Sequence, residues 1–177
     1  MQKLFTKRDA CIAVSVAGVD VDRISWDEYF LKLALVTAER STCKRHHVGT
    51  IIVKDKHVLT GGYNGAPSGM EECLELGCLR DAQNIPSGER TEICRAVHSE
   101  ENAIIQAAVH GINIAGSTVY STHTPCRRCA KMLCNAKILA FVACGRYNEY
   151  VFEDLFNATG INLTILARPS LFIEELK

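Results

Sequence analysis

Apolar residues recur along this chain with two spacings, one typical of helices and one typical of strands. Ser25-Trp26-Asp27-Glu28 forms a capping box, and the apolar positions that follow it repeat at helical spacing. We therefore expect a helix from Trp26 to about Arg40. The same spacing predicts further helices that run from near His98 to Gly111, from Pro125 onwards, and over 149–158 with an end at Gly160.

Short segments rich in β-branched residues lie between the predicted helices. The first two, 48–53 and 58–63, flank a Lys-Asp-Lys-His turn and predict a hairpin. Further strands are expected over 117–121, 139–143 and 161–166. Strands that alternate with helices are typical of an α/β sandwich, and here the later strands are expected to be parallel.

Length and composition limit the number of domains that the chain can form. Its 177 residues, of which 47% are hydrophobic and 23% are charged, suit one globular domain. We expect residues 24–177 to form this domain, with an irregular insert at about 68–97, and residues 1–23 to be an extension of unclear role. No segment approaches the roughly 18–20 apolar residues of a membrane span, and Asp9 interrupts the one stretch that resembles a signal peptide. We therefore expect a cytoplasmic protein with no membrane partner.

Charge and cysteine content narrow the classes of function. Lys plus Arg and Asp plus Glu both number 20, and this balance argues against a nucleic-acid partner. The 9 cysteines cannot all pair into disulfides within one chain, and a chain of this length needs no disulfides to hold its core. Core thiols, catalytic thiols and metal ligands are the interpretations that remain.

Two segments carry residue types from which a metal site is built. Pro125-Cys126-Arg127-Arg128-Cys129 places two thiols on one face of a predicted helix start, where the helix dipole favours thiolates. His98 is the best candidate for a nitrogen ligand, and two Cys with one His is a pattern of catalytic zinc with an open fourth position. Zinc lowers the pKa of a bound water to near neutrality. Glu100 lies two residues from His98, which suits a proton shuttle that does not bind the metal.

Each of these segments alone has a less specific interpretation. A Cys-x-x-Cys pair also occurs in redox sites, and a His-x-Glu triplet is usually part of an exposed helix surface. Their joint occurrence in this order, on two predicted helix starts with a strand between them, makes coincidence a poor explanation. His-x-Glu followed by Pro-Cys-x-x-Cys is the signature of zinc-dependent base deaminases.

The sequence resembles the deoxycytidylate (dCMP) deaminase family over about residues 24–166. Besides the two segments above, the resemblance rests on Arg40-Ser41-Thr42-Cys43, Val48-Gly49 and Gly62-Tyr63-Asn64-Gly65-Ala66-Pro67. Family members more often have Ala in place of Ser99 and often have His in place of Glu72. The resemblance implies a three-layer α/β/α sandwich with a central five-stranded mixed sheet. It also implies zinc-dependent hydrolysis of dCMP to dUMP and ammonia, a reaction that feeds thymidylate synthesis.

The same resemblance implies roles for single residues. Glu100 would be the catalytic proton shuttle, and the catalytic zinc would be held by His98, Cys126 and Cys129. Asn64 would hydrogen-bond the substrate, although an Asn-Gly pair is also a turn signal. Tyr147 would contact the nucleotide, or would be a half-buried core ring. Arg45 is a candidate for the 5′-phosphate, against the alternative of a solvated loop residue.

Some members of the family hold a second, structural zinc. Here its ligands would be four cysteines from the end of the first helix and from the insert, namely Cys43, Cys73, Cys78 and Cys94. Four thiolates would close a tetrahedral site, which would account for an irregular loop of this length in a compact domain. The alternative is that one or more of them are ordinary buried thiols.

The resemblance further implies a homo-oligomer, commonly a hexamer, with dCTP as activator, dTTP as inhibitor, and Mg²⁺ accompanying these effectors. Two rival functions stay open. One is deamination of another cytosine or adenine nucleoside or nucleotide, or of a tRNA adenosine, and the neutral charge disfavours the tRNA. The other is a zinc-binding module without catalysis, for which Glu100 would serve no purpose.

Overall fold

A computed structural model describes residues 23–147 and 152–171. Within these residues the helices are α1 (Trp26–Ala38), α2 (Cys73–Leu76), α3 (Leu79–Ala82), α4 (Ser99–Val109), α5 (Arg127–Asn135) and α6 (Phe152–Thr159), with a 3-10 turn at Thr91–Ile93. The strands are β1 (Gly49–Lys54), β2 (His57–Tyr63), β3 (Thr118–Ser121), β4 (Ala140–Ala143) and β5 (Asn162–Ile165). The expected extension over 1–23 lies outside the described residues except for Arg23.

The helices α1 and α4 start within one residue of the positions that the sequence predicts. Ser25 Oγ accepts the backbone N–H of Glu28 at 3.1 Å, which caps α1. The expectation that Pro125 opens a helix is wrong, because Pro125 precedes the N-cap of α5. That N-cap is Cys126, which keeps an extended backbone with φ −72° and ψ 165°. The extended cap residue places the Cys126 thiol at the tip of the helix, outside its first turn.

The five strands form one mixed sheet in the order β2-β1-β3-β4-β5. Strand β1 pairs antiparallel with both β2 and β3, whereas β3, β4 and β5 run parallel. This confirms the five-stranded mixed sheet and its parallel later half. Because β1 runs against its neighbours, its start lies beside the carboxyl ends of β2 and β3, with Gly49 opposite Tyr63 and Thr50 opposite Ser121. The loops that follow β2, β3 and β4 therefore meet at one edge of the sheet.

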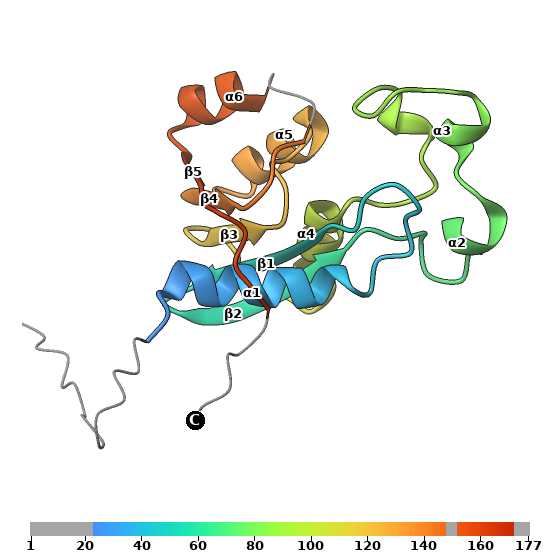
Figure 1. Cartoon of the computed structure of the whole chain (residues 1–177). Helices are drawn as coiled ribbons and strands as arrows, with labels where there is room; N and C mark the ends of the chain where they lie inside the picture. The colour runs from blue at the N-terminus through green and yellow to red at the C-terminus, as the bar shows by residue number, and fades with distance from the viewer. Residues whose placement is uncertain (1–22, 148–151, 172–177) are drawn as a thin grey trace, which may run out of the picture.

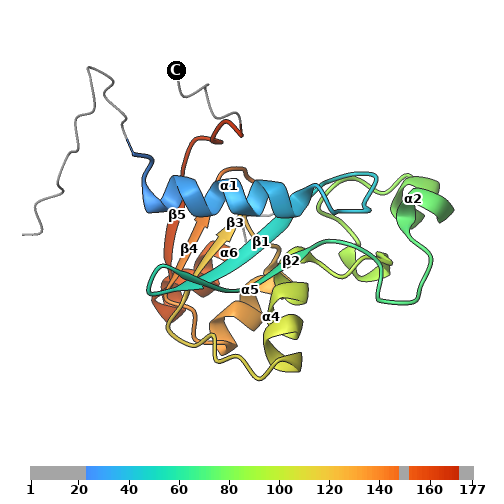
Figure 2. The same cartoon turned by 90° about the horizontal axis from the view of Figure 1, so that it is seen from below.

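Helices cover both faces of the sheet and give the three-layer α/β/α sandwich that the sequence predicts (Figure 1). Helix α1 lies alone on one face, and α4, α5 and α6 lie on the other (Figure 2). Alternation along β1 explains the two cores, since successive side chains of a strand point to opposite faces. Ile51 and Val53 pack with Phe30 of α1, and Ile52 joins the core under α4–α6 with Phe141.

The helix α4 approaches β2 closely because a glycine faces it. A Cβ atom on Gly62 would lie 2.5 Å from the backbone nitrogen of Ala103 and 2.5 Å from the carbonyl oxygen of Ser99. Any larger residue would push α4 off the sheet. The glycine therefore fixes the distance between the sheet and the first turn of α4.

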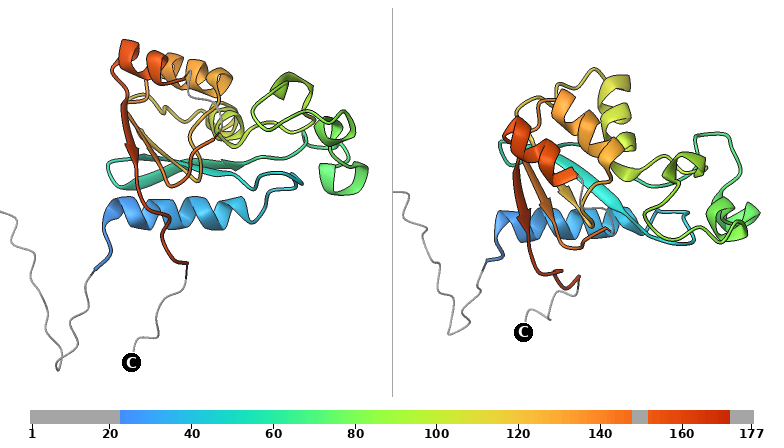
Figure 3. Two further views of the ribbon diagram at one scale, coloured as in Figure 1. Left: turned by 45° about the horizontal axis from the view of Figure 1, so that its top comes forward. Right: turned by 90° about the horizontal axis from the view of Figure 1, so that it is seen from above.

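The predicted insert is built from short pieces of helix. It contains α2, α3 and the 3-10 turn, and it projects from the edge of the sheet at which the loops meet (Figure 3). An isolated bridge between Gly65 and Val97 joins the two ends of the insert. Among the described residues, no helix has both the length and the apolar character needed to cross a membrane.

Candidate active site

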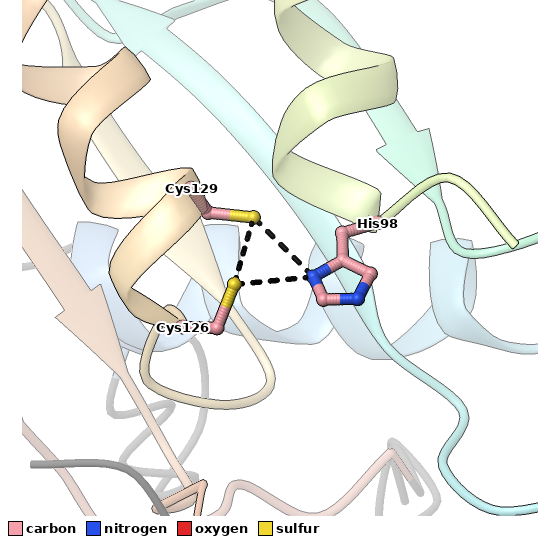
Figure 4. Close-up of side chains that lie close together, drawn as sticks. All are labelled: His98, Cys126 and Cys129. Atoms are coloured by element: carbon pink, nitrogen blue, oxygen red, sulfur yellow. Dashed lines mark hydrogen bonds between the residues drawn. The ribbon is translucent and has the colours of Figure 1, made fainter. Parts of the chain in front are cut away.

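Two helix N-termini present the three residues expected to bind zinc. His98 is the N-cap of α4 and Cys126 is the N-cap of α5, and Cys129 lies in the first turn of α5. The loops that precede both helices leave the same edge of the sheet, so the two helix starts face each other. Figure 4 shows the imidazole of His98 pointing toward both thiols. The structure thus brings together the three residues that the sequence singled out.

The three side chains form a nearly equilateral triangle. His98 Nδ1 lies 3.4 Å from Cys126 Sγ and 3.4 Å from Cys129 Sγ, and the two sulfurs are 3.5 Å apart. Ligands bound to one tetrahedral zinc at ~2.0–2.3 Å lie about 3.6 to 3.8 Å from one another. The triangle is within a few tenths of an ångström of this spacing, and its donor set suits zinc. Among the described residues, it is the one cluster of three or more metal-binding side chains whose ligand atoms all lie within 4.8 Å.

The charges of the metal-free triangle are unevenly distributed. The hydrogen bond with Cys129 and the neighbouring His98 lower the pKa of Cys126 to about 4, although burial raises it. Burial lowers the pKa of His98, but the hydrogen bond to Cys126 and the charge of Glu100 outweigh it and raise the pKa to about 9. The same hydrogen bond and burial raise the pKa of Cys129. Without metal, the triangle therefore holds one thiolate, one imidazolium and one thiol at neutral pH.

Glu100 lies beside this triangle, and within the described part of the chain it forms no ion pair. It is 4% exposed, and burial raises the pKa of its carboxyl group. Ser99 Oγ donates to Glu100 Oε2 at 3.0 Å and lies 2.8 Å from Thr50 Oγ1. A carboxyl group with a raised pKa in a buried site is suited to accept and return a proton.

One cavity contains Glu100 and the triangle residues His98 and Cys126. Its wall comes from the loop before β1, the start of the β2–α4 segment, the insert, and the loops after β3 and β4. All the residues that the sequence proposed as substrate contacts line it, namely Arg45, Asn64 and Tyr147. Residues far apart in the chain therefore share one pocket with the candidate metal site.

Asn64 uses most of its amide group to hold the neighbouring loops. Its Oδ1 accepts from Ser41 Oγ at 2.6 Å and from the backbone N–H of Val48 at 2.9 Å, and its Nδ2 donates to the His46 carbonyl at 2.8 Å. Asn64 does not have a positive φ, so it does not adopt the left-handed turn that its pairing with Gly65 also suggested. The second N–H of the amide has no hydrogen-bond partner among the described residues.

Tyr147 lies in a group of aromatic rings on the cavity wall. Its ring meets that of His46 edge-on at a centroid distance of 5.8 Å, and His46 lies 6.1 Å from His123 in the same manner. Burial lowers the pKa of both histidines, which keeps them neutral. No sequence motif marks His46 or His123, and only the folded loops bring these two rings together with Tyr147.

Arg45 is joined in the cavity wall by arginines that no sequence motif marks. Arg45 Nε pairs with Asp81 Oδ1 at 2.6 Å, and its Nη2 donates to the Ile85 carbonyl at 2.5 Å. The insert adds Arg80 and Arg95 to the same wall. Isolated arginines in a loop carry no pattern of their own, so only the folded insert reveals that these three meet.

The four cysteines expected to bind a second zinc also line this cavity: Cys43, Cys73, Cys78 and Cys94. Burial raises the pKa of Cys73, and the other three thiols raise it further. They do not form a cluster of ligand atoms within 4.8 Å of one another. All four are free thiols.

Comparison with known proteins connects this site to a family. The family described as "Cytidine and deoxycytidylate deaminase zinc-binding region" matches residues 24–144. The ComE operon protein 2 of Bacillus subtilis is 35% identical over 155 residues, which cover 87% of this chain and 78% of that protein. The deoxycytidylate deaminase of Schizosaccharomyces pombe is 32% identical over 142 residues, which cover 80% of this chain and 44% of that protein.

A solved structure agrees with the sequence matches. The dCMP deaminase of the cyanophage S-TIM5, in complex with dCMP and dUMP, superposes with a TM-score of 0.67 and 29% identity, covering 78% of this chain and 95% of that chain. The family match over residues 24–144 includes β1 to β4, His98, Glu100 and both cysteines of the triangle. The chain therefore belongs to the cytidine and deoxycytidylate deaminase family, whose zinc-binding region it carries.

Proposed function

We propose that this protein deaminates dCMP to dUMP by hydrolysis, with release of ammonia, and so supplies a precursor for thymidylate synthesis. The observation that carries the proposal is the buried His98–Cys126–Cys129 triangle with Glu100 in the same cavity. The similarity to the S. pombe deoxycytidylate deaminase and to the cyanophage dCMP deaminase supports the choice of substrate.

The residues divide the chemistry between them. Zinc held by His98, Cys126 and Cys129 would supply a Lewis acid that lowers the pKa of a water molecule toward neutrality. Glu100 takes a proton from the attacking water, passes it to the ring nitrogen of cytosine, and then assists the departure of ammonia. The raised pKa of Glu100, which follows from its burial, favours both the uptake and the return of this proton.

The cavity wall provides contacts for the rest of the nucleotide. The remaining N–H of Asn64 would donate to the sugar or base, and the Tyr147 ring would pack against the nucleotide beside His46. Arg45 keeps Nη1 buried and without a hydrogen-bond partner, which suits a contact with the 5′-phosphate.

Ammonia release from a panel of substrates tests this function. The panel contains dCMP, CMP, dCTP, cytosine and a tRNA stem that bears the target adenosine. We expect dCMP to be the best substrate, and turnover of another member without turnover of dCMP would reject the proposal. Glu100→Gln should abolish turnover and leave the zinc content unchanged, whereas full activity of this variant would reject the proton-shuttle role of Glu100. Absence of turnover with every substrate of the panel, at full zinc content, would favour a zinc module without catalysis.

A second zinc in the insert is part of the proposal. The four thiols line one cavity without forming a ligand cluster, and zinc would draw Cys43, Cys73, Cys78 and Cys94 together into a closed structural site. Metal analysis should give about two zinc per chain, falling to about one in Cys73→Ser. Cys134→Ser, which changes a partly buried thiol on α5, is the control and should keep both. A single zinc in the unchanged protein would reject the second site.

Regulation and assembly follow from the family resemblance. We propose a cytoplasmic homo-oligomer, such as a hexamer, that dCTP activates and dTTP inhibits, with Mg²⁺ bound to the effector triphosphates. Light scattering with and without each nucleotide, combined with rates at subsaturating dCMP, tests these points. A monomer whose rate neither nucleotide changes would contradict them.

A further inference from the structure

The insert brings an excess of positive charge to the catalytic cavity. Arg45, Arg80 and Arg95 line the wall, and Glu100 is the one carboxylate that lines it among the residues that the structure describes. Arg45 has Asp81 as a partner, and Arg95 Nη1 donates to the Gly77 carbonyl at 3.0 Å. The deamination step acts on the base and uses none of these arginines, so their presence in the cavity needs another explanation.

Arg80 is a buried arginine of this wall. It is 3% exposed, its Nη2 donates to the Pro86 carbonyl at 2.8 Å, and its Nη1 reaches Cys94 Sγ at 3.7 Å. Its Nε is buried and has no hydrogen-bond partner. Within residues 23–147 and 152–171, no carboxylate oxygen lies within 4.0 Å of its guanidinium group. The exposed carboxylates of Asp81 and Glu92 act on Arg80 only from a longer distance. A buried cation without a counter-charge in contact is unfavourable, so this position favours an anion from outside the protein.

The position of Arg80 also suits a ligand that extends from the reaction centre. An arginine guanidinium is not deprotonated in proteins, so the group stays charged. Its contact with Tyr147 places it beside the ring proposed to pack on the nucleotide. Arg45 Nη1 is a second buried guanidinium nitrogen in the same wall without a partner.

We propose that Arg80, together with Nη1 of Arg45, binds the phosphate monoester of the substrate, so that the insert selects a nucleotide over a nucleoside. The inference rests on the proposed function and adds the residue that decides this preference. Arginine suits the role because its planar group can donate two parallel hydrogen bonds to phosphate oxygens. An alternative counter-charge for Arg80 is the thiolate of Cys94 in a zinc-bound insert.

Comparison of dCMP with deoxycytidine measures the contribution of the 5′-phosphate, because the two substrates differ only in this group. The phosphate is remote from the reacting carbon and contributes equally to substrate and transition-state binding, so its loss should appear mainly in KM. We expect Arg80→Met to raise the KM for dCMP about 100-fold, which is typical for a buried charged partner. The kcat/KM for deoxycytidine should stay within about threefold of the unchanged protein. Arg80→Lys should be intermediate, because it keeps the charge and loses the paired donors.

Controls separate this inference from other causes. Arg90→Gln removes an exposed cation of the same insert and should leave both substrates unaffected. Zinc content and circular dichroism report whether each variant is folded. If Arg80→Met does not fold, the test uses the ratio of kcat/KM for dCMP to kcat/KM for deoxycytidine in Arg80→Lys. If Arg80→Met lowers kcat/KM equally for dCMP and deoxycytidine, with or without loss of zinc, the inference is overturned. Arg80 would then support the cysteines of the insert and not the phosphate. Failure of the unchanged protein to deaminate dCMP would instead reject the proposed function.

Discussion

Glu101 and Arg128 form an ion pair that joins the two helices of the candidate zinc site, with Oε1 of Glu101 2.6 Å from Nε of Arg128. Glu101 lies in the first turn of α4, and its Oε2 accepts the backbone N–H of His98 at 3.0 Å. Arg128 lies on α5 between Cys126 and Cys129. One carboxylate that is 4% exposed therefore contacts the segments that carry all three expected zinc ligands.

This bridge predicts that Arg128 helps to set the spacing of the triangle. Arg128→Ala would leave a buried carboxylate without its cation, which favours movement of α4 relative to α5. We expect zinc affinity, measured by competition with a chromophoric chelator, to fall about tenfold, as is typical for residues that orient ligands. Lys131→Ala changes an exposed residue of the same helix and is the control. Equal zinc affinity in both variants would show that the ion pair has no positioning role.

The protonation of the metal-free triangle predicts how zinc binding depends on pH. Between about pH 4 and pH 9 the metal-free site holds a protonated His98 and a Cys126 thiolate, and Cys129 is a thiol. Zinc binds neutral imidazole and thiolates, so binding must displace one proton from His98 and one from Cys129. Affinity should therefore rise as pH rises, by about 100-fold per pH unit within this window.

Calorimetry measures this proton release directly. Titration of the metal-free protein with zinc at pH 7, in two buffers of different ionisation enthalpy, should give about two protons released per zinc. The raised pKa of His98 and the raised pKa of Cys129 each contribute one of them. A release near zero would mean that the metal-free ligands already stand in their binding forms.

Ser99 offers a test of how Glu100 is oriented. Its hydroxyl donates to Glu100 Oε2 at 3.0 Å, and Ser99 is fully buried. Ser99→Ala removes about 1 kcal/mol of hydrogen bonding, and we expect kcat for dCMP to fall about fivefold with unchanged zinc content. Ser117→Ala is a matched control, because it removes another buried hydroxyl, which donates to the Ile114 carbonyl away from the site. Unchanged kcat in Ser99→Ala would leave Glu100 oriented by its backbone and packing alone.

Gly62 provides a test of the close contact between α4 and the sheet. A Cβ at this position would lie 2.5 Å from two backbone atoms of α4, which cannot move without displacing the helix. We expect Gly62→Ala to lower the free energy of unfolding by about 2 to 3 kcal/mol, as overpacking does elsewhere. Gly61→Ala is the control, since its Cβ would meet the flexible end of Ile51 and should cost under about 1 kcal/mol. Chemical denaturation of both variants gives the comparison, and equal stability would contradict the packing argument.

The sequence by itself determines the elements and the candidate zinc ligands. Helix caps and strand alternation depend on residues a few positions apart, so α1, α4 and the five strands follow from local patterns. The Cys-x-x-Cys spacing places both thiols at one helix start. His98 and Glu100 are likewise identified by their spacing of two residues. Pro125 shows the limit of local signals, because the geometry of the Cys126 cap decides where α5 begins.

Only the tertiary structure decides which distant groups meet at the cavity. Arg80 stands in the insert without any motif, and its buried and unpartnered Nε is visible only once the insert has packed beside Tyr147. Asn64 is similar, since its contacts with Ser41 and the His46 carbonyl depend on loops that the sheet brings together. The physical reason is that burial and charge pairing arise from long-range packing, whereas caps and spacings are encoded within one turn of the chain.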